Sequence, residues 1–456
     1  MNRPLIRIKK IEVQNFKNIE NGSIEFKSNN FSPNIYGSEI MGIYGQNGSG
    51  KTAVIEALLF LKIILTGKSL PDYSSDYIYL AATKTLLKLE LYISNDNISY
   101  NVFYNFVFRR TNESFEIASE TLSYRKIGEQ EKIDIIRFDV DDSSSPFFPK
   151  SRYEELSKLN KDLEFEFEVT RRMSRKECKS YIFNKDTIRA FNSSEIALDY
   201  YNIITWIQFY AKFNLFVITN QHSAPIALNF MPICFRVENE KSISSGDIHV
   251  WLHEPSLIDI EKYSIVQSIT DQMNIVLSKI IPGLYVYIEN LGKELSRENK
   301  EMIKIELFTC RNNMKVPLKY ESEGIKRIVS ILSALISMFN NPSICLAVDE
   351  LDSGIFEYLL GELLDIIEKH GQGQLIFTSH NLRALEKLNK NSIIVSTANS
   401  KNRFIRMKNI KKNNNLRNMY LRGVDLGGLD ESIYEETNTY EIAYAFRKAG
   451  DCFGKN

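Results

Sequence analysis

The chain has 456 residues, which is enough for two or three domains, and 43% of them are hydrophobic, which supplies substantial cores. Lysine plus arginine equals aspartate plus glutamate at 57 each, so the composition excludes a global basic field that would hold nucleic acid. No apolar run approaches the roughly 20 residues that cross a bilayer, and we expect a cytoplasmic protein with no membrane partner. The five cysteines lack C-x-x-C spacing, which indicates neither a disulfide framework nor a zinc site.

The first informative segment is the loop at 45–52, which reads Gly-Gln-Asn-Gly-Ser-Gly-Lys-Thr and satisfies the pattern G-x-x-x-x-G-K-[ST]. It lies between a strand-like apolar run at 40–44 and a helical apolar pattern at 53–61, which is the context that a phosphate-binding loop requires. Glycines let successive N–H groups point at phosphate oxygens, and the positive end of the following helix adds to the attraction. We therefore predict a nucleotide-binding site formed by Gln46, Asn47, Gly48, Ser49, Gly50, Lys51 and Thr52.

Two side chains of this loop have the chemistry that a nucleotide requires. Lys51 would neutralise the β- and γ-phosphates. Thr52 would offer its hydroxyl to Mg²⁺, an ion that keeps several waters and takes few protein ligands. The loop thus predicts ATP and Mg²⁺ as cofactors.

After the loop, apolar and polar residues alternate at 86–93 and 100–108, which predicts antiparallel strands that complete a first lobe. A Ser-Ser-Ser-Pro break then precedes helix-like stretches at 152–163 and 194–212. We therefore predict a compact, mostly helical insertion over 141–283. The insertion lacks sustained heptads, so an extended coiled-coil arm is not expected.

Two further motifs each end a short apolar strand pattern. The run at 344–348 leads into Asp349 and Glu350. Asp349 would hold the Mg²⁺ shell, whereas Glu350 would polarise the water that attacks the γ-phosphate. The run at 374–378 leads into His380, whose imidazole would donate to the γ-phosphate or orient the water.

Ahead of the acidic strand, an apolar helix pattern covers 328–336, and Ser322 is a good N-cap for it. By itself this segment predicts a capped helix. In company with the other motifs, it resembles a degenerate form of the serine–glycine signature of ABC-type ATPases, with Ser322 and Gly324 at the matching positions. Glu323 and Ile325 stand where that signature has glycine and glutamine or glutamate, which implies an altered contact with a second nucleotide.

The order of these motifs resembles the ABC-type ATPases of the SMC, RecF and OLD group, which are similar to AAA15 and AAA21 domains. The resemblance covers about 1–110 and 284–400, and it implies an α/β fold. The implied fold has a head of the ABC-type P-loop NTPase kind, with a mixed sheet flanked by helices and an antiparallel β lobe. The opening strand resembles the group's "N-F-K" turn near the nucleotide, which implies Lys17 as a phosphate contact. A glutamine loop has only Gln221 as a candidate, and a polar turn after a strand explains that residue better.

We divide the chain into four parts on this basis. They are the N-terminal half of the head with the phosphate loop (1–140), the mostly helical insertion (141–283), the C-terminal half of the head (284–400), and a C-terminal strand and helical tail (401–456). We expect the tail to pack on the chain's own core. No nuclease motif follows His380, so nuclease or toxin activity is expected of another chain.

In ABC-type heads the signature helix of a second subunit completes each active site, so the resemblance implies a homo-oligomer built from ATP-sandwich dimers. Compact, arm-less ATPases of this group, such as PtuA and AriA, act as sensor or scaffold subunits of bacterial anti-phage defence systems. The similar layout here implies control of a separate nuclease or toxin effector, with DNA or a phage protein as the trigger.

Two alternatives stay open. One is a RecF-like DNA-repair ATPase that clamps DNA, and the other is a low-turnover, nucleotide-binding regulatory scaffold. Basic runs at 171–176 and 403–422 are candidate DNA patches for the first, although a solvated charged face explains either.

Overall fold

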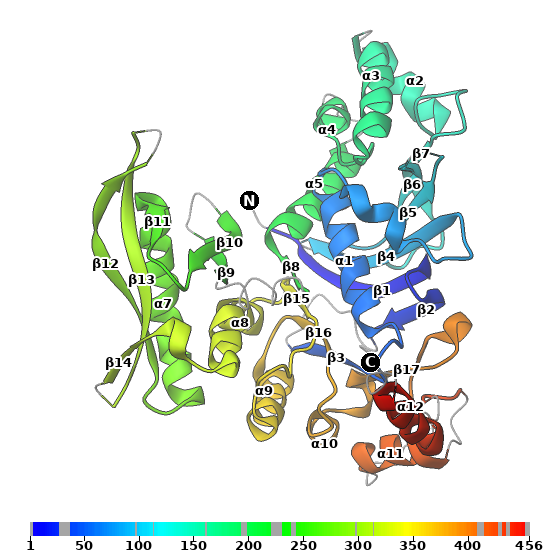
Figure 1. Ribbon diagram of the computed structural model, residues 1–456. Helices are drawn as coiled ribbons and strands as arrows, with labels where there is room; N and C mark the ends of the chain where they lie inside the picture. The colour runs from blue at the N-terminus through cyan, green and yellow to red at the C-terminus, as the bar shows by residue number, and fades with distance from the viewer. Residues whose placement is uncertain are drawn as a thin grey trace.

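The computed structural model describes most of the chain (Figure 1). The described residues are 3–26, 37–95, 98–112, 114–159, 162–192, 198–219, 230–238, 243–296, 299–312, 314–407, 415–426, 431–434 and 438–451. Among them, no helix combines the length and the apolar character needed to span a membrane.

An antiparallel sheet of six strands forms the first layer, with the order β2-β1-β4-β5-β6-β7. Its strands are β1 (Leu5–Phe16), β2 (Ile19–Glu25), β4 (Lys84–Asn95), β5 (Ile98–Arg110), β6 (Phe115–Lys126) and β7 (Ile133–Asp139). Along β5, buried and partly exposed side chains alternate, because one face of the sheet packs on the core. The prediction of antiparallel strands at 86–93 and 100–108 is confirmed, since both runs lie in the paired strands β4 and β5.

A second sheet of six strands contains the strand before the phosphate loop, with the order β18-β17-β3-β16-β15-β8. Its strands are β3 (Glu39–Tyr44), β8 (Leu215–Ile218), β15 (Cys345–Val348), β16 (Gln374–Thr378), β17 (Ile393–Ser396) and β18 (Phe404–Ile405). All pairings are parallel except that of β18. The carboxyl ends of β3, β15 and β16 therefore meet at one edge, where ligands bind in open α/β sheets.

The second sheet is buried on both faces, and alternate residues of β15 face different hydrophobic cores. The first core lies against α1 (Lys51–Leu65) and the antiparallel sheet. The second lies against α8 (Glu323–Asn340) and α9 (Glu357–His370). Burial on both sides explains why β15 is a continuous apolar run in the sequence rather than an alternating one.

The segment predicted as a mostly helical insertion begins with four helices at the top of Figure 1. They are α2 (Lys150–Leu159), α3 (Asp162–Glu177), α4 (Lys185–Asn192) and α5 (Leu198–Phe213). Glu120 of β6 fixes them to the antiparallel sheet, because its buried carboxylate accepts hydrogen bonds from Ser180 Oγ at 2.6 Å and from the Tyr181 N–H at 2.8 Å. Burial raises the pKa of Glu120 to about 7.

The same segment also contains strands, which the mostly helical prediction did not include. β8 pairs with β15 in the central sheet, and it is followed by the hairpin of β9 (Phe230–Glu238) and β10 (Ile243–Trp251). β8 has only four residues, all buried, so its apolar pattern is too short to distinguish a strand from the end of a helix. The division of the chain into four parts stays a prediction.

A further lobe stands at the left of Figure 1. It contains β11 (Ser256–Asp259), α7 (Ile260–Ile280), β12 (Tyr285–Leu295), β13 (Glu301–Arg311) and β14 (Met314–Pro317). One face of its sheet packs on α7. After β14 the chain continues into α8, so the predicted signature helix joins this lobe to the head.

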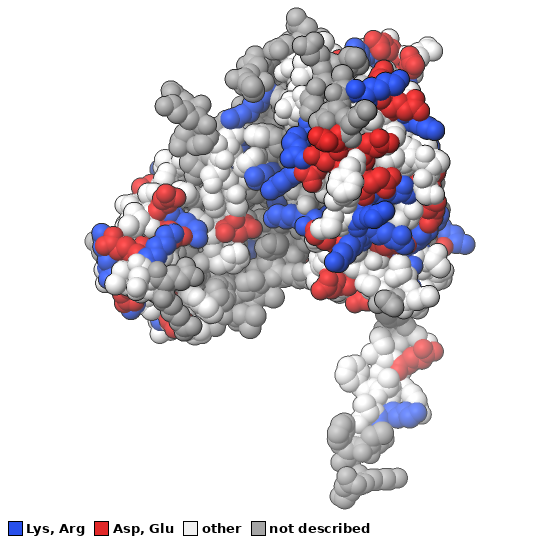
Figure 2. All heavy atoms as spheres, turned by 90° about the horizontal axis from the view of Figure 1, so that it is seen from above, with Lys and Arg blue, Asp and Glu red and all other residues white. Residues whose placement is uncertain are grey.

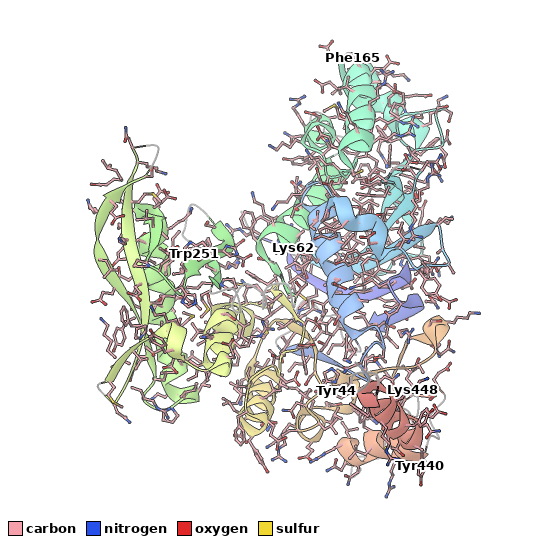
Figure 3. The ribbon with its side chains drawn as sticks, viewed as in Figure 1. Tyr44, Lys62, Phe165, Trp251, Tyr440 and Lys448 are labelled. Atoms are coloured by element: carbon pink, nitrogen blue, oxygen red, sulfur yellow. The ribbon has the colours of Figure 1, made fainter. Side chains whose placement is uncertain are left out.

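The C-terminal region contains α10 (Ala384–Lys387), α11 (Leu416–Leu426) and α12 (Thr439–Asp451). α11 packs on the second core through its buried Leu416 and Tyr420. The expectation that the tail packs on the chain's own core is wrong for α12, which projects from the body in Figure 2. Tyr440 and Phe446 of α12 are 87% and 77% exposed (Tyr440 is labelled in Figure 3). The apolar side chains of α12 lie on more than one side of the helix, so they form no single stripe that docks on one surface.

Candidate functional site

The phosphate loop lies between β3 and α1, as the sequence predicts. Gly50 is the N-cap residue of α1 and has φ +87°, a left-handed conformation that favours glycine. A Cβ at Gly50 would also lie 3.1 Å from Ile19 Cγ1 and 3.2 Å from Asn18 Oδ1. No side chain caps α1, so the N–H groups of its first turn are available to bind an anion.

Lys51 is held against the loop that precedes it. Its Nζ donates to the carbonyl of Gly45 at 2.8 Å and to that of Gln46 at 2.9 Å. Burial lowers the pKa of Lys51, while the carboxylates of Asp349 and Glu350 act in the opposite direction. The ammonium group is therefore partly desolvated and close to the position that a phosphate would take.

Asp349 follows β15 directly and lies fully buried against α1. Its Oδ1 accepts hydrogen bonds from Thr52 Oγ1 at 3.2 Å and from Thr378 Oγ1 at 2.6 Å. Its Oδ2 is buried without a hydrogen-bond partner among the described residues. Burial raises the pKa of Asp349. An unpartnered carboxylate oxygen beside a threonine hydroxyl fits the predicted Mg²⁺ site, because Mg²⁺ binds hard oxygen ligands.

Glu350 and His380 lie at the same edge of the sheet. Glu350 has φ +48°, an uncommon value for a residue with a Cβ, and its N–H donates to Thr378 Oγ1 at 2.7 Å. The His380 N–H donates to Asp352 Oδ2 at 3.1 Å. Burial lowers the pKa of His380, and the charge of Lys51 lowers it further, so the imidazole is neutral near pH 7.

Most of these groups meet in a cavity of about 440 Å³, although Asp349 is not among its lining residues. Its lining residues are Lys17, Asn18, Asn47, Gly48, Gly50, Lys51, Thr52, Ala53, Glu350, Thr378 and His380. The structure thus brings together most of the predicted residues, whose chemical roles stay predictions. Gln46 and Ser49 are not among the lining residues; instead they shape the loop, since Ser49 Oγ donates to the Gln46 carbonyl at 2.7 Å.

Three lining residues, Asn18, Ala53 and Thr378, were missed by the sequence analysis, and two of them have side chains that hydrogen-bond predicted residues. Thr378 lies two positions before His380 in the same strand end, and it hydrogen-bonds both acidic residues that follow β15. Asn18 follows Lys17 and donates from its amide to the Gly48 carbonyl. Only their proximity to predicted residues could have indicated them.

Lys17 lines the cavity, but its ammonium group already has an acidic partner. Its Nζ lies 2.5 Å from Glu56 Oε2 and 4.8 Å from the centroid of the Tyr77 ring. A role as a phosphate contact therefore requires Lys17 to share or exchange this partner, and it stays a prediction.

Ser322 and Gly324 are absent from the residues that line the cavity of their own chain. Ser322 is the N-cap of α8, and its side chain accepts a hydrogen bond from the Ile325 N–H, which agrees with the predicted cap. Gly324 packs on Gly354, which lies in the turn after the acidic pair. The contact is so close that a Cβ added at Gly324 would lie 1.9 Å from the Gly354 carbonyl oxygen. The candidate glutamine-loop residue, Gln221, lies outside the described residues.

Arg171 and Arg403, one from each candidate DNA patch, are committed to the fold, whereas 408–414 of the second patch lie outside the described residues. Arg171 donates to four backbone carbonyls, those of Asp139, Val140, Asp142 and Ser145. Arg403 is buried and donates to the carbonyls of Thr397, Ala398 and Asn18. These guanidinium groups are therefore structural in the free chain.

Comparison with known proteins gives one family and several similar folds. The family model described as AAA ATPase domain (AAA_15) matches residues 7–384. No curated protein matches the chain in sequence. The Smc head domain of Pyrococcus furiosus, solved with an extended coiled coil and the C-terminal domain of ScpA, has 14% identity and a TM-score of 0.42; the match covers 88% of this chain and 96% of that one.

Two other solved structures are similar in the same way. The SMC head domain from Thermotoga maritima has 14% identity and a TM-score of 0.37, and the match covers 88% of this chain and all of that one, at 100%. The recombination mediator protein RecF with ATP has 14% identity and a TM-score of 0.33, with 82% of this chain and 94% of that chain covered.

The raised pKa of Asp349 leads to a pH-dependent prediction. Because its pKa is higher in the folded chain than in the unfolded chain, the ionised carboxylate destabilises the nucleotide-free fold at high pH and has no effect below about pH 4. We expect Asp349→Asn to raise the melting temperature without nucleotide at pH 8, with a difference that shrinks as the pH falls. Asp271→Asn, at an exposed position of α7, is the control and should change nothing.

The same variant should lose stabilisation by nucleotide. At 100 times its dissociation constant, Mg²⁺–ATP would stabilise the wild-type chain by about 2.7 kcal/mol, and Asp349→Asn should show much less. Thermal unfolding with and without Mg²⁺–ATP measures both effects. An Asp349→Asn chain that is less stable than the wild type at pH 8 without nucleotide would contradict the assignment.

Proposed function

The chain belongs to the AAA_15 family of AAA ATPase domains, and on this basis we propose that it binds Mg²⁺–ATP in the cavity beside α1 and hydrolyses it. The observation that carries the proposal is the 3.2 Å separation of Thr52 Oγ1 and Asp349 Oδ1. These residues are 297 positions apart in the sequence, yet they form the oxygen pair that an ATP-bound Mg²⁺ requires.

Each group has a role that follows from its position. Loop N–H groups and Lys51 bind the phosphates, and Thr52 and Asp349 hold the metal ion. When bound, Mg²⁺ neutralises charge that develops on the phosphate oxygens. Glu350 polarises the attacking water, and the neutral imidazole of His380 orients that water or donates to the γ-phosphate.

We further propose that a second copy completes the site. Ser322 and Gly324 do not line the cavity of their own chain, which supports a site shared between two copies. Ser322 is exposed at the N-terminus of α8, where the helix dipole attracts an anion. An ATP molecule between two copies would then contact the phosphate loop of one and the N-terminus of α8 of the other.

Two variants test this function directly. Lys51→Ala should prevent nucleotide binding, because it removes the cation that binds the phosphates. Glu350→Gln should bind ATP, fail to hydrolyse it, and accumulate as an ATP-bound dimer. Light scattering with and without Mg²⁺–ATP measures the change in mass, and a Glu350→Gln chain that does not respond to ATP would defeat the proposal.

A mixing experiment tests whether the site is shared. Ser322→Asp keeps a good N-cap but puts a carboxylate opposite the partner's phosphates, so hydrolysis should fall at least about tenfold. Ser322→Asn, which caps equally well without the charge, is the matched control. An equimolar mixture of Ser322→Asp with Lys51→Ala should regain about a quarter of the wild-type rate, since random pairing gives half of the dimers one intact site. No recovery on mixing would show that each site lies within one chain.

The cellular role that we propose is that of a sensor or scaffold subunit of a bacterial anti-phage defence system. ATP-dependent oligomerisation would then control a separate nuclease or toxin effector. Support comes from the layout, in which a compact insertion of short helices and strands takes the place of a long arm. The altered signature residues Glu323 and Ile325 favour a second candidate, a regulatory scaffold with low turnover.

Copurification followed by mass spectrometry tests the cellular role, and we expect an effector chain in a fixed ratio to this one. Steady-state hydrolysis with and without duplex DNA provides the contrast. We expect no stimulation by DNA, because the net charge is zero and Arg171 and Arg403 of the candidate patches already donate to backbone carbonyls. Strong stimulation would instead support a DNA-clamping enzyme, and a very low rate in all conditions would support the scaffold.

A further inference from the structure

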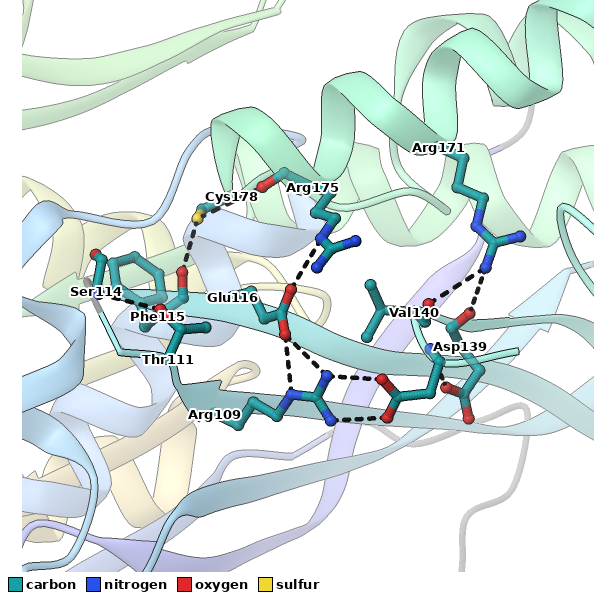
Figure 4. Close-up of polar contacts among 11 residues, drawn as sticks. Arg109, Thr111, Ser114, Phe115, Glu116, Asp139, Val140, Arg171, Arg175 and Cys178 are labelled. Atoms are coloured by element: carbon teal, nitrogen blue, oxygen red, sulfur yellow. Dashed lines mark hydrogen bonds and ion pairs between the residues drawn. The ribbon is translucent and has the colours of Figure 1, made fainter. Parts of the chain in front are cut away.

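The helix α3 presents two different faces. Its inner face is anchored to the antiparallel sheet: Leu163 and Phe167 are buried in the core, and Arg175 forms an ion pair with Glu116 at 3.0 Å. Figure 4 shows this side, where Arg171 and Arg175 reach from α3 to the strands. The position of α3 on the body is therefore fixed by contacts that leave the opposite face uncovered.

The outer face of α3 has an apolar stripe. Phe165, Val169 and Met173 follow one another at intervals of four residues and are 74%, 40% and 43% exposed. This spacing puts them on one side of the helix, and Figure 3 shows Phe165 at the outer end of the molecule. Phe165 and Val169 also line a hollow of about 400 Å³ together with charged neighbours. Three exposed apolar side chains in one row are a surface that a partner would cover.

Charges beside the stripe are separated by sign along the helix. Glu164 and Glu168 lie in the first half, and Arg172 and Lys176 lie in the second half. Within the described part of the chain, none of these four side chains forms an ion pair, although Glu164 accepts a hydrogen bond from Tyr153. Figure 2 views this end of the molecule and shows acidic and basic side chains in neighbouring patches.

We propose that α3 is a contact site for a second copy of this chain, with the two α3 helices antiparallel. In that arrangement the stripes cover each other, and the acidic half of each helix lies beside the basic half of the other. A parallel arrangement would put like charges together and is disfavoured. The charge pattern therefore selects a copy of the same chain as the partner, because the surface is complementary to itself under a two-fold rotation.

This contact is separate from the nucleotide site and does not depend on ATP. α3 lies at the top of Figure 1, away from the sheet edge where β3, β15 and β16 end. A helix of 16 residues is about 24 Å long, and one helix pair buries less than the roughly 1,200 Å² of a typical stable interface. We therefore expect a weak contact that is measurable by itself at high protein concentration and becomes stronger when other contacts also hold the copies together.

Charge reversal tests the contact in chains that carry Lys51→Ala, without nucleotide, so that ATP-dependent pairing does not contribute. One variant is Glu164→Lys with Glu168→Lys, and the other is Arg172→Glu with Lys176→Glu. Each should weaken self-association measured by sedimentation about tenfold, because attraction between the two halves becomes repulsion. The control is Glu261→Lys with Asp271→Lys on exposed positions of α7, which should leave association unchanged.

The decisive samples restore complementarity without restoring the native residues. A chain with all four reversals is again self-complementary and should regain association, and an equimolar mixture of the two double variants should associate as mixed pairs. Circular dichroism verifies that each variant is folded. Association should also weaken as salt is raised. The proposal is overturned if the chain with wild-type α3 stays monomeric at the highest soluble concentration. It is also overturned if the chain with all four charge reversals does not regain self-association.

Discussion

The contact between Thr52 and Asp349 is the constraint on which the rest of the head depends. It joins the start of α1 to the end of β15, and it forms only if β3 and β15 lie on either side of β16 in one parallel sheet. Every pairing in this part of the sheet is between distant segments, so two hydrophobic cores must close around it before the contact exists. β8 lies within the segment predicted as an insertion, and it extends the same sheet by pairing with β15.

The sequence predicted those parts of the site whose signal is local. The phosphate loop, the acidic pair and His380 each sit at the end of a strand, and a short apolar run followed by polar residues is visible without the fold. The contact of Gly324 with Gly354 has no such signal, because it arises where two separate segments pack. β8 was indicated only as a strand before Gln221, and its pairing with β15 was not predicted, because four buried residues are too few for periodicity to identify a strand. The exposed α12 was predicted as part of a helical tail, but its expected position on the core was wrong, because a helical pattern does not reveal which surface, if any, the helix covers.

Charge at the proposed nucleotide site is incompletely compensated by groups of the chain itself. Asp349 is fully buried with one oxygen lacking a partner, and Lys51 is bound to carbonyls rather than to a carboxylate. Arg327 donates to the backbone carbonyl of Asp349 at 2.8 Å, and its charge opposes the rise in the pKa of the Asp349 side chain that burial causes. Each group is partly desolvated and incompletely compensated, which costs folding free energy. Mg²⁺ and phosphate would supply the missing partners, so binding energy at this site is linked to the stability of the whole head.

The two proposed self-complementary surfaces would restrict the assemblies that the chain forms. A dimer made through the nucleotide sites and a dimer made through α3 each have a two-fold axis, and the two surfaces lie on different parts of the molecule. If both contacts form, each copy joins two neighbours through different interfaces, and a closed assembly must contain an even number of copies. Hydrolysis would release only the contact that contains ATP and leave the α3 pairs intact. The nucleotide state would then determine how many copies an assembly contains, and not only whether an assembly forms. A scaffold that holds or releases a separate effector needs this property.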